Sequence, residues 1–237
     1  MIFSPGPAIT PEGDRCLIVR YGSRLDAEIS ARCLATTRVI ERARLPGVLD
    51  VVPSFATVAV HYQPSSVSDT PYRTLRAAVA ALLESRPFVS VAAAHTVRVP
   101  VCYDDAFAMD MAYVASASGL TRRQIIDLHT SDRVTVFALG FAPGLPYIGV
   151  HDERFDLPRR ATPRTVVPAG SVAIANRQSV IYPNAGPGGW HVIGAVPVPL
   201  FDPDKAPHTL LAPGDAVRFV AVTRRKFDAL REEVRGH

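Results

Sequence analysis

The 237-residue sequence contains only three cysteines, Cys16, Cys33 and Cys102, and no CxxC pair. An odd number of widely spaced cysteines argues against a disulfide framework and against a structural zinc site. The N-terminus shows no charged-then-apolar signal pattern, and no apolar run reaches the length that spans a bilayer. We therefore expect a cytoplasmic protein that has no metal site and no contact with a membrane.

Lysine is also scarce, since only Lys205 and Lys226 accompany 24 arginines among the 26 basic residues. The arginines are scattered and the net charge is only +4. Without a basic stripe or a DNA- or RNA-binding motif, no nucleic-acid partner is expected. Walker loops, GxGxxG after a strand, HExxH and GxSxG are all missing, which excludes a simple one-chain kinase or hydrolase.

The first part of the chain alternates strand and helix patterns. Extended runs are expected at 15–21, 48–52, 55–62 and 95–103, and amphipathic helices at 26–43 and from Pro71 to about residue 83. The order βαββαβ predicts a ferredoxin-like domain over residues 15–103. Residues 1–14 hold three prolines and two glycines, so we expect a poorly structured leader there.

The remaining chain changes character twice. Residues 104–132 have helical spacing and are expected to form a helical connector between two domains. Residues 133–223 carry many short β-branched runs between Gly/Pro turns, which predicts a barrel or sandwich domain. Residues 224–237 are expected to form a C-terminal surface helix and tail. The fold class is therefore α+β, with two domains.

The β-rich part also holds the candidate functional residues. Twelve of the 21 prolines and nine of the 15 glycines lie between Gly140 and Gly214. Proline fixes the φ angle and glycine permits unusual φ angles, so loops rich in both can hold their side chains in fixed positions. The candidates presented by this framework are Tyr147, Arg159, Arg164, Ser171, Tyr182, Trp190 and His191.

Each candidate has a functional and a structural interpretation. Arg164 can grip a carboxylate or phosphate bidentately, or it can bridge two loops through their carbonyls. Ser171, in PAGSV, can orient a carbonyl oxygen together with nearby amides, or it can simply form a turn. His191 can transfer protons near neutral pH, although strand alternation points it away from Trp190. Trp190 can form part of a binding site or belong to the core.

Several long motifs carry a family resemblance. They are GFAPGLPYIG at 140–149, RRATPRT at 159–165, PAGSVAIA at 168–175, IYP…PGGW…IG at 181–194 and LFDP…LLAPGDAVRF at 200–219. In this order they closely resemble the family of 5-oxoprolinase B subunits, also called allophanate hydrolase subunit 1 or KipI-like, a carboxyltransferase domain of subdomains C and D. The likeness implies a cyclophilin-like β-barrel over residues 133–223, following the ferredoxin-like domain.

The resemblance also implies a function. Such a chain is one component of an ATP-dependent 5-oxoprolinase, which opens 5-oxoproline to glutamate. It is active only with a C-type partner, which is of the allophanate hydrolase subunit 2 type, and with an A-type lactam hydrolase subunit. ATP with Mg is needed in the complex, and no cofactor is expected on this chain alone.

Roles for the candidates follow from this chemistry, in which a lactam oxygen gains negative charge. Arg164 and Arg159 are expected to bind the anionic group, and Ser171 to orient a carbonyl. Tyr147, Tyr182 and Trp190 are expected to wall the pocket, with His191 as acid or base. Two alternatives stay open: the carboxyltransferase half of a biotin-dependent urea carboxylase, and a KipI-like inhibitor of a sensor histidine kinase.

Overall fold

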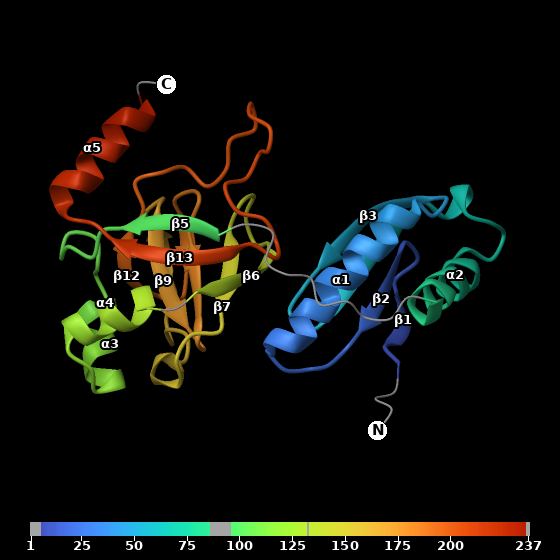
Figure 1. The fold of residues 1–237 in the computed structure, drawn as a ribbon, viewed down its shortest axis with the longest axis horizontal. Helices are drawn as coiled ribbons and strands as arrows, with labels where there is room; N and C mark the ends of the chain where they lie inside the picture. The colour runs from blue at the N-terminus through green and yellow to red at the C-terminus, as the bar shows by residue number, and fades with distance from the viewer. Residues whose placement is uncertain (1–5, 86–95, 132, 236–237) are drawn as a thin grey trace. The chain divides into compact units, whose positions relative to one another are not determined.

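The computed structural model describes residues 6–85, 96–131 and 133–235. The chain divides into two compact units, Met1–Ala92 and Ala93–His237 (Figure 1). Within the described ranges, no helix has the length and apolar character needed to cross a membrane.

The first unit is an antiparallel four-stranded sheet with two long helices. Its strands are β1 (Ala8–Glu12), β2 (Cys16–Arg20), β3 (Val48–Pro53) and β4 (Thr57–Tyr62), in the spatial order β1-β2-β4-β3. Its helices are α1 (Ala27–Ala43) and α2 (Pro71–Ser85), with a short 3₁₀ helix at Pro64–Ser66. The apolar faces of sheet and helices form one core, which includes Leu17, Val19, Cys33, Ile40, Val58, Val60, Tyr62, Leu75 and Val79.

Local sequence signals explain where the helices begin. The Asp26 carboxylate accepts hydrogen bonds from the amides of Glu28 and Ile29 at 2.8 and 3.0 Å and so caps α1, which lies within the helix expected at 26–43. Helix α2 begins at Pro71, where a missing amide hydrogen costs nothing because the first helical amides have no partner within the helix.

Two predictions for the first unit are wrong. The expected leader contains β1, which pairs with β2 from Ala8 opposite Arg20 to Glu12 opposite Cys16. The strand expected as the last of the ferredoxin-like domain, β5 (Thr96–Val101), belongs to the sheet of the second unit. The hairpin through Gly13, at φ 65°, places β1 beside β2 and fills the sheet edge that residues 95–103 were expected to occupy.

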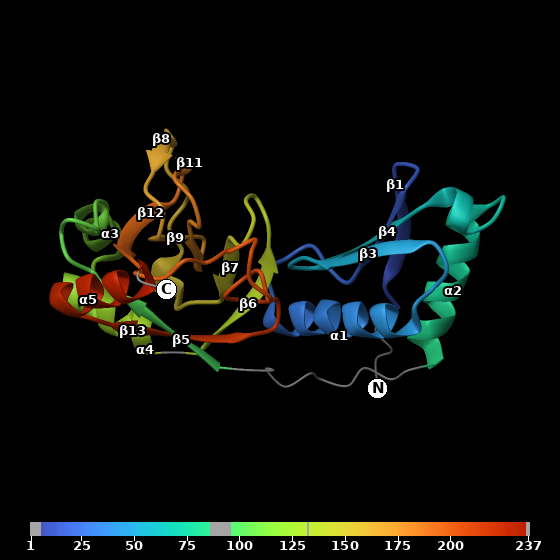
Figure 2. The same ribbon diagram turned by 90° about the horizontal axis from the view of Figure 1, so that it is seen from above.

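The second unit is a seven-stranded curled sheet (Figure 2). The strands run in the order β12-β9-β10-β7-β6-β13-β5, and only β13 and β5 are parallel. Their bounds are β6 (Val134–Leu139), β7 (Pro146–Gly149), β9 (Ser171–Ala175), β10 (Gln178–Ile181), β12 (His191–Ala195) and β13 (Ala216–Ala221). A separate two-stranded ribbon consists of β8 (Arg164–Val167) and β11 (Gly186–Gly188), and a 3₁₀ helix spans Glu153–Phe155.

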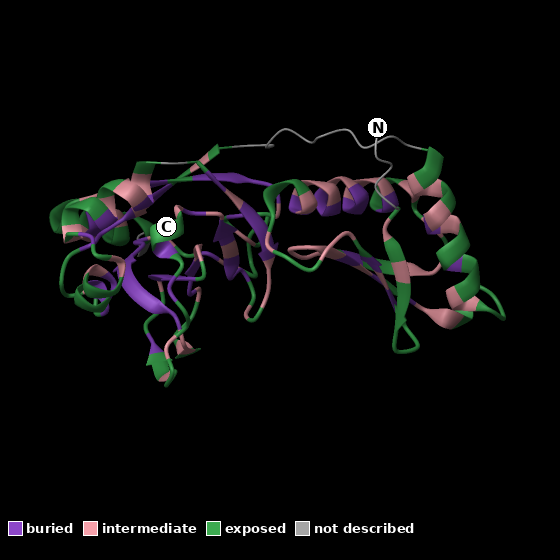
Figure 3. Cartoon of the chain, turned by 90° about the horizontal axis from the view of Figure 1, so that it is seen from below, coloured by how far each residue is buried: buried purple, intermediate pink, exposed green. Residues whose placement is uncertain are grey.

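The curl brings the two outer strands of this sheet together at one end. Cys102, directly after β5, and Ala195, at the end of β12, exchange two backbone hydrogen bonds of 2.8 and 2.9 Å. The sheet is therefore a half-barrel whose two edges meet only at this bridge among the described residues. In Figure 3 its central strands are almost entirely buried, and every residue of β9 and β12 is buried. Because successive side chains of a strand point to opposite faces, both faces of these two strands are covered.

The helices expected to connect two domains instead belong to the second unit. Helices α3 (Met111–Ser118) and α4 (Arg122–Ser131) bury Met111, Val114 and Ile125 in the same core as the sheet. Strand β7 was not expected, because Pro146 lies in a motif that reads as a loop. Proline is tolerated at the first residue of a strand, which is where β7 begins. The C-terminal helix α5 (Arg224–Arg235) is present where a surface helix was predicted.

Candidate functional site

Arg164 is held by a carboxylate that the sequence did not single out. Its Nη1 and Nη2 each donate a 2.7 Å hydrogen bond to Asp110, one to each carboxylate oxygen. Arg160 adds a bond of 2.9 Å to Asp110, and the Val192 amide adds another of 2.7 Å. The guanidinium does grip a carboxylate bidentately, but that carboxylate is an internal one.

This cluster joins three separate parts of the second unit: the start of α3, the ribbon strand β8 and the sheet strand β12. The Asp110 side chain is only 4% exposed. Burial alone would raise the pKa of Asp110, but the hydrogen bonds from Arg164 and Val192 and the two arginine charges outweigh it, so the pKa is lowered. Asp110 is therefore ionised at neutral pH and fixes the position of both arginines.

Four of the predicted residues lie together in a cluster that we call the aromatic face, in which Tyr182 and Trp190 are buried, at 4% and 6% exposure. The rings of Tyr147 and Trp190 meet edge to face with their centroids 6.0 Å apart. Tyr147, Tyr182 and Trp190 belong to one apolar cluster. The Arg159 guanidinium carbon lies 5.4 Å from the centre of the Trp190 ring, within cation–π range. Arg159 is exposed and forms no ion pair with any residue that the structure describes.

The glycines of the GPGG segment serve this face by leaving room. A Cβ atom on Gly188 would lie 2.7 Å from Cζ of Tyr182 and would also collide with its hydroxyl oxygen. Only glycine permits the ribbon strand β11 to pass this close to the buried tyrosine. Burial raises the pKa of Tyr182.

His191 lies apart from the aromatic face. Its ring stacks on Tyr113 of α3 at 4.5 Å, and its Nε2 donates a 2.8 Å hydrogen bond to the carbonyl of Pro158. The proton is thereby assigned to Nε2. The Nδ1 atom is buried and has no hydrogen-bond partner among the described residues. His191 and Trp190 thus face opposite sides, as strand alternation requires.

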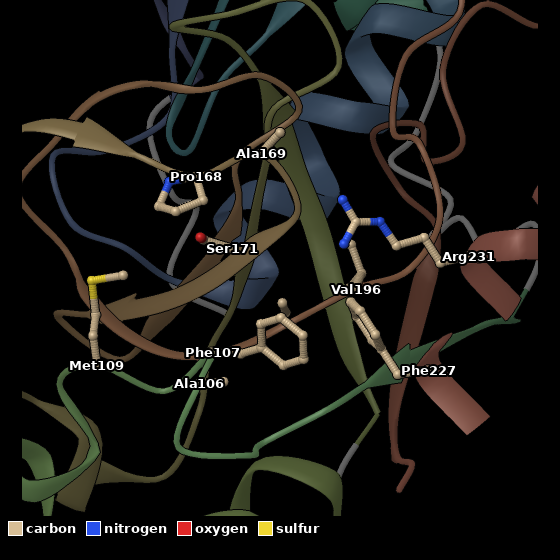
Figure 4. A pocket seen from close by; sticks show the side chains of 10 residues that line it. Ala106, Phe107, Met109, Pro168, Ala169, Ser171, Val196, Phe227 and Arg231 are labelled. Carbon is tan, nitrogen blue, oxygen red and sulfur yellow. The ribbon is translucent and has the colours of Figure 1, made fainter. Parts of the chain in front are cut away.

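Ser171 lies in different surroundings again. It is 3% exposed and lines a small cavity whose walls come from the segment before α3, the turn before β9, the segment after β12 and helix α5 (Figure 4). None of the aromatic-face residues lines this cavity. The structure therefore does not bring Ser171 to the two arginines with which the sequence interpretation grouped it.

A buried polar network was missed entirely. Tyr103 Oη lies 2.6 Å from Nδ1 of His129, and both His129 Nε2 and His151 Nε2 contact the Ser179 hydroxyl at 2.9 and 2.8 Å. One assignment of the hydrogens makes all three contacts hydrogen bonds: Tyr103 donates to His129, His129 donates to Ser179, and Ser179 donates to His151.

The burial of this network keeps both histidines neutral. Burial, followed by the proximity of His151, lowers the pKa of His129, and burial lowers the pKa of His151 to about 4. Burial raises the pKa of Tyr103. The signal in the sequence was weak: His129 follows Ile125 by four residues on the apolar face of α4, where a residue is expected to be buried.

Metal binding finds no ready site in the described parts of the chain. No three His, Cys, Asp or Glu side chains there come close enough together to hold an ion. The three cysteines are buried and free.

Comparison with known proteins gives consistent results. The family described as "Carboxyltransferase domain, subdomain C and D" matches residues 7–211. The B subunit of the Bacillus subtilis 5-oxoprolinase is 34% identical over 93% of this chain and 95% of its own length. The crystal structure of TTHA0988 is 36% identical with a TM-score of 0.76, and the match covers 88% of this chain but only 40% of that one. The Kluyveromyces lactis urea amidolyase shares the fold at 21% identity and a TM-score of 0.77, over 97% of this chain and 16% of that one.

Proposed function

Because the chain belongs to the carboxyltransferase subdomain C and D family, together with the 5-oxoprolinase B subunits, we propose that it is the B subunit of an ATP-dependent 5-oxoprolinase. The observation that carries the proposal is the whole-length match to the Bacillus subtilis protein of that name. In this proposal the complex opens 5-oxoproline to glutamate, and the chain acts with a C-type partner and an A-type subunit.

Ring opening requires stabilisation of the negative charge that develops on the lactam oxygen. Arg159 is the arginine of the aromatic face whose charge is not balanced by a described carboxylate, and Trp190 supports it. We therefore assign Arg159 to the anionic group of the reacting ligand. Arg164 has a positioning role, because its bonds to Asp110 fix strand β8 of the ribbon against β12.

The residues of this chain do not fit an ATP–Mg site. The sequence contains no glycine-rich phosphate loop, and no cluster of three potential ligands lies within the described ranges. We place the nucleotide on another component of the complex. The cytoplasm is the proposed compartment, where the three free thiols remain reduced.

Co-expression with C-type and A-type proteins tests the proposal. The complex should hydrolyse ATP in the presence of 5-oxoproline and release glutamate, and omission of this chain should abolish both. Urea with a carboxylated biotin carrier serves as the comparison substrate, because the urea amidolyase shares the fold. Glutamate release without this chain would refute the assignment. Carboxylation of urea by a complex that releases no glutamate from 5-oxoproline would refute it as well.

One substitution tests the site separately. Arg159→Gln should raise the KM for the anionic substrate about tenfold by removing a charge-assisted contact. Arg123→Gln is the matched control, since Arg123 is an exposed arginine in a weak surface pair with Asp127 at 3.5 Å. Equal kinetics for the two variants would show that the aromatic face does not bind substrate.

A further inference from the structure

The cavity beside Ser171 has the features of a small-molecule site. It has a volume of about 140 Å³. Its walls are largely apolar, and Phe107, Val196 and Phe227 contribute the larger surfaces. A cavity of about 150 Å³ accommodates one benzene ring, so the space suits a single five- or six-membered ring.

The Ser171 hydroxyl is an unused hydrogen-bonding group in this cavity. The residue is 3% exposed, and its side chain forms no hydrogen bond with any described residue. Its backbone is fully engaged, because the amide bonds to the Pro168 carbonyl and the carbonyl accepts from the Tyr182 amide. Because Ser171 lines the cavity, a ligand carbonyl or amide there can form a hydrogen bond with this hydroxyl.

Arg231 supplies the charge at the opening. It follows Phe227 by four residues on α5, so both side chains lie on the same face of the helix. Phe227 is 3% exposed and packs on Phe107 at 4.5 Å, which fixes the helix against the cavity. Figure 4 shows the Arg231 guanidinium extending toward the space from α5, while Ser171 lies beside Pro168.

The charge of Arg231 is not neutralised nearby. The neighbouring Arg224 is paired with Asp228 at 2.9 Å, whereas Arg231 forms no ion pair within the described residues. The cavity therefore combines an apolar body, one hydroxyl at depth and one free cation at its rim. That combination matches a compact ring that bears a carboxylate and a polar ring group.

We propose that this cavity binds a small cyclic carboxylate, with the carboxylate on Arg231 and a ring amide or carbonyl on Ser171. Naming 5-oxoproline as that ligand rests on the proposed function, since this molecule is a five-membered lactam with one carboxylate. Ser171 and Arg231 then form a second binding site for the substrate, separate from the reacting site at Arg159 and the aromatic face.

Ligand-detected NMR on the full chain tests the cavity directly. L-5-oxoproline should bind, and the uncharged L-5-oxoprolinamide should bind about tenfold more weakly, because it lacks the carboxylate that pairs with Arg231. Arg231→Gln should weaken L-5-oxoproline binding about tenfold and remove the preference for the acid over the amide. Ser171→Ala should weaken both ligands equally.

Arg225→Gln is the matched control, because it makes the same charge change on α5 and Arg225 does not line the cavity. Wild-type protein that binds neither ligand, or an Arg231→Gln variant that retains wild-type affinity, would overturn the proposal. In the assembled complex, Ser171→Ala and Arg231→Gln should raise the KM for 5-oxoproline. Normal KM values with full turnover in these variants would refute substrate binding in the cavity and leave the proposed function intact. An inactive wild-type complex would refute only the proposed function.

Discussion

Acidification should destabilise the second unit through its buried histidines. The pKa of His151 is about 4 in the folded chain and about 6.5 when unfolded. The unfolded state therefore binds the proton first, so stability is full above pH 6.5 and falls as the pH drops toward 4. The linkage relation gives a loss of about 2 kcal/mol at pH 5 and about 3 kcal/mol at pH 4 from this group. His129, whose pKa is also lowered, adds to the loss.

Urea denaturation followed by tryptophan fluorescence measures this effect, because the only tryptophan, Trp190, lies in the second unit. His151→Phe is the informative variant, since an aromatic ring keeps the packing against Phe155 and Phe219. The variant starts from lower stability, because Ser179 loses a partner, but its loss between pH 7.5 and pH 5 should be about 2 kcal/mol smaller. An equal loss of unfolding free energy between pH 7.5 and pH 5 in wild type and variant would refute the argument that His151 is buried and neutral.

Two further predictions concern the ribbon and its ion cluster. Asp110→Ala should cost about 3 kcal/mol of unfolding free energy, because two partly buried guanidinium groups lose their carboxylate. The exposed Asp105→Ala should cost less than about 1 kcal/mol, and similar losses in urea denaturation would contradict the importance of burial. Gly188→Ala should lower the melting temperature, because Tyr182 must move at a cost of about 1–3 kcal/mol in unfolding free energy. Gly186→Ala is the control, because a Cβ atom there meets nothing within 4 Å. Equal melting temperatures for the two glycine variants would show that the contact is not tight.

Local signals predicted many of the elements well. Strands β6 and β9 lie within residues 133–223, where short β-branched runs indicated strands, and α1 lies within the helix expected at 26–43. Pairing was harder to foresee because it depends on distant residues. Strand β5 has the alternation expected of any half-buried strand, and only the position of β13, more than a hundred residues later, determines which sheet it joins.

The candidate site was predicted in part, for a similar reason. The Gly/Pro framework identified Tyr147, Arg159, Tyr182 and Trp190, which the structure brings together. Asp110 was missed because it lies before a helix, 54 residues from Arg164, and carries no motif of its own. Ser171 was grouped with Arg159 and Arg164, since nothing local shows that it lines a cavity together with Arg231 of α5.

The parallel pair β5 and β13 also determines when each unit can fold during synthesis. All strands of the first unit lie within residues 8–62, so this sheet can form while the ribosome is still translating the second half. The second sheet cannot be completed until β13, at residues 216–221, has left the ribosome. Until then β5 and β6 each lack a neighbour, and exposed strand edges of this kind pair readily with other chains. Aggregation during expression is therefore expected to arise from the second unit, and truncations that remove β13 should increase it.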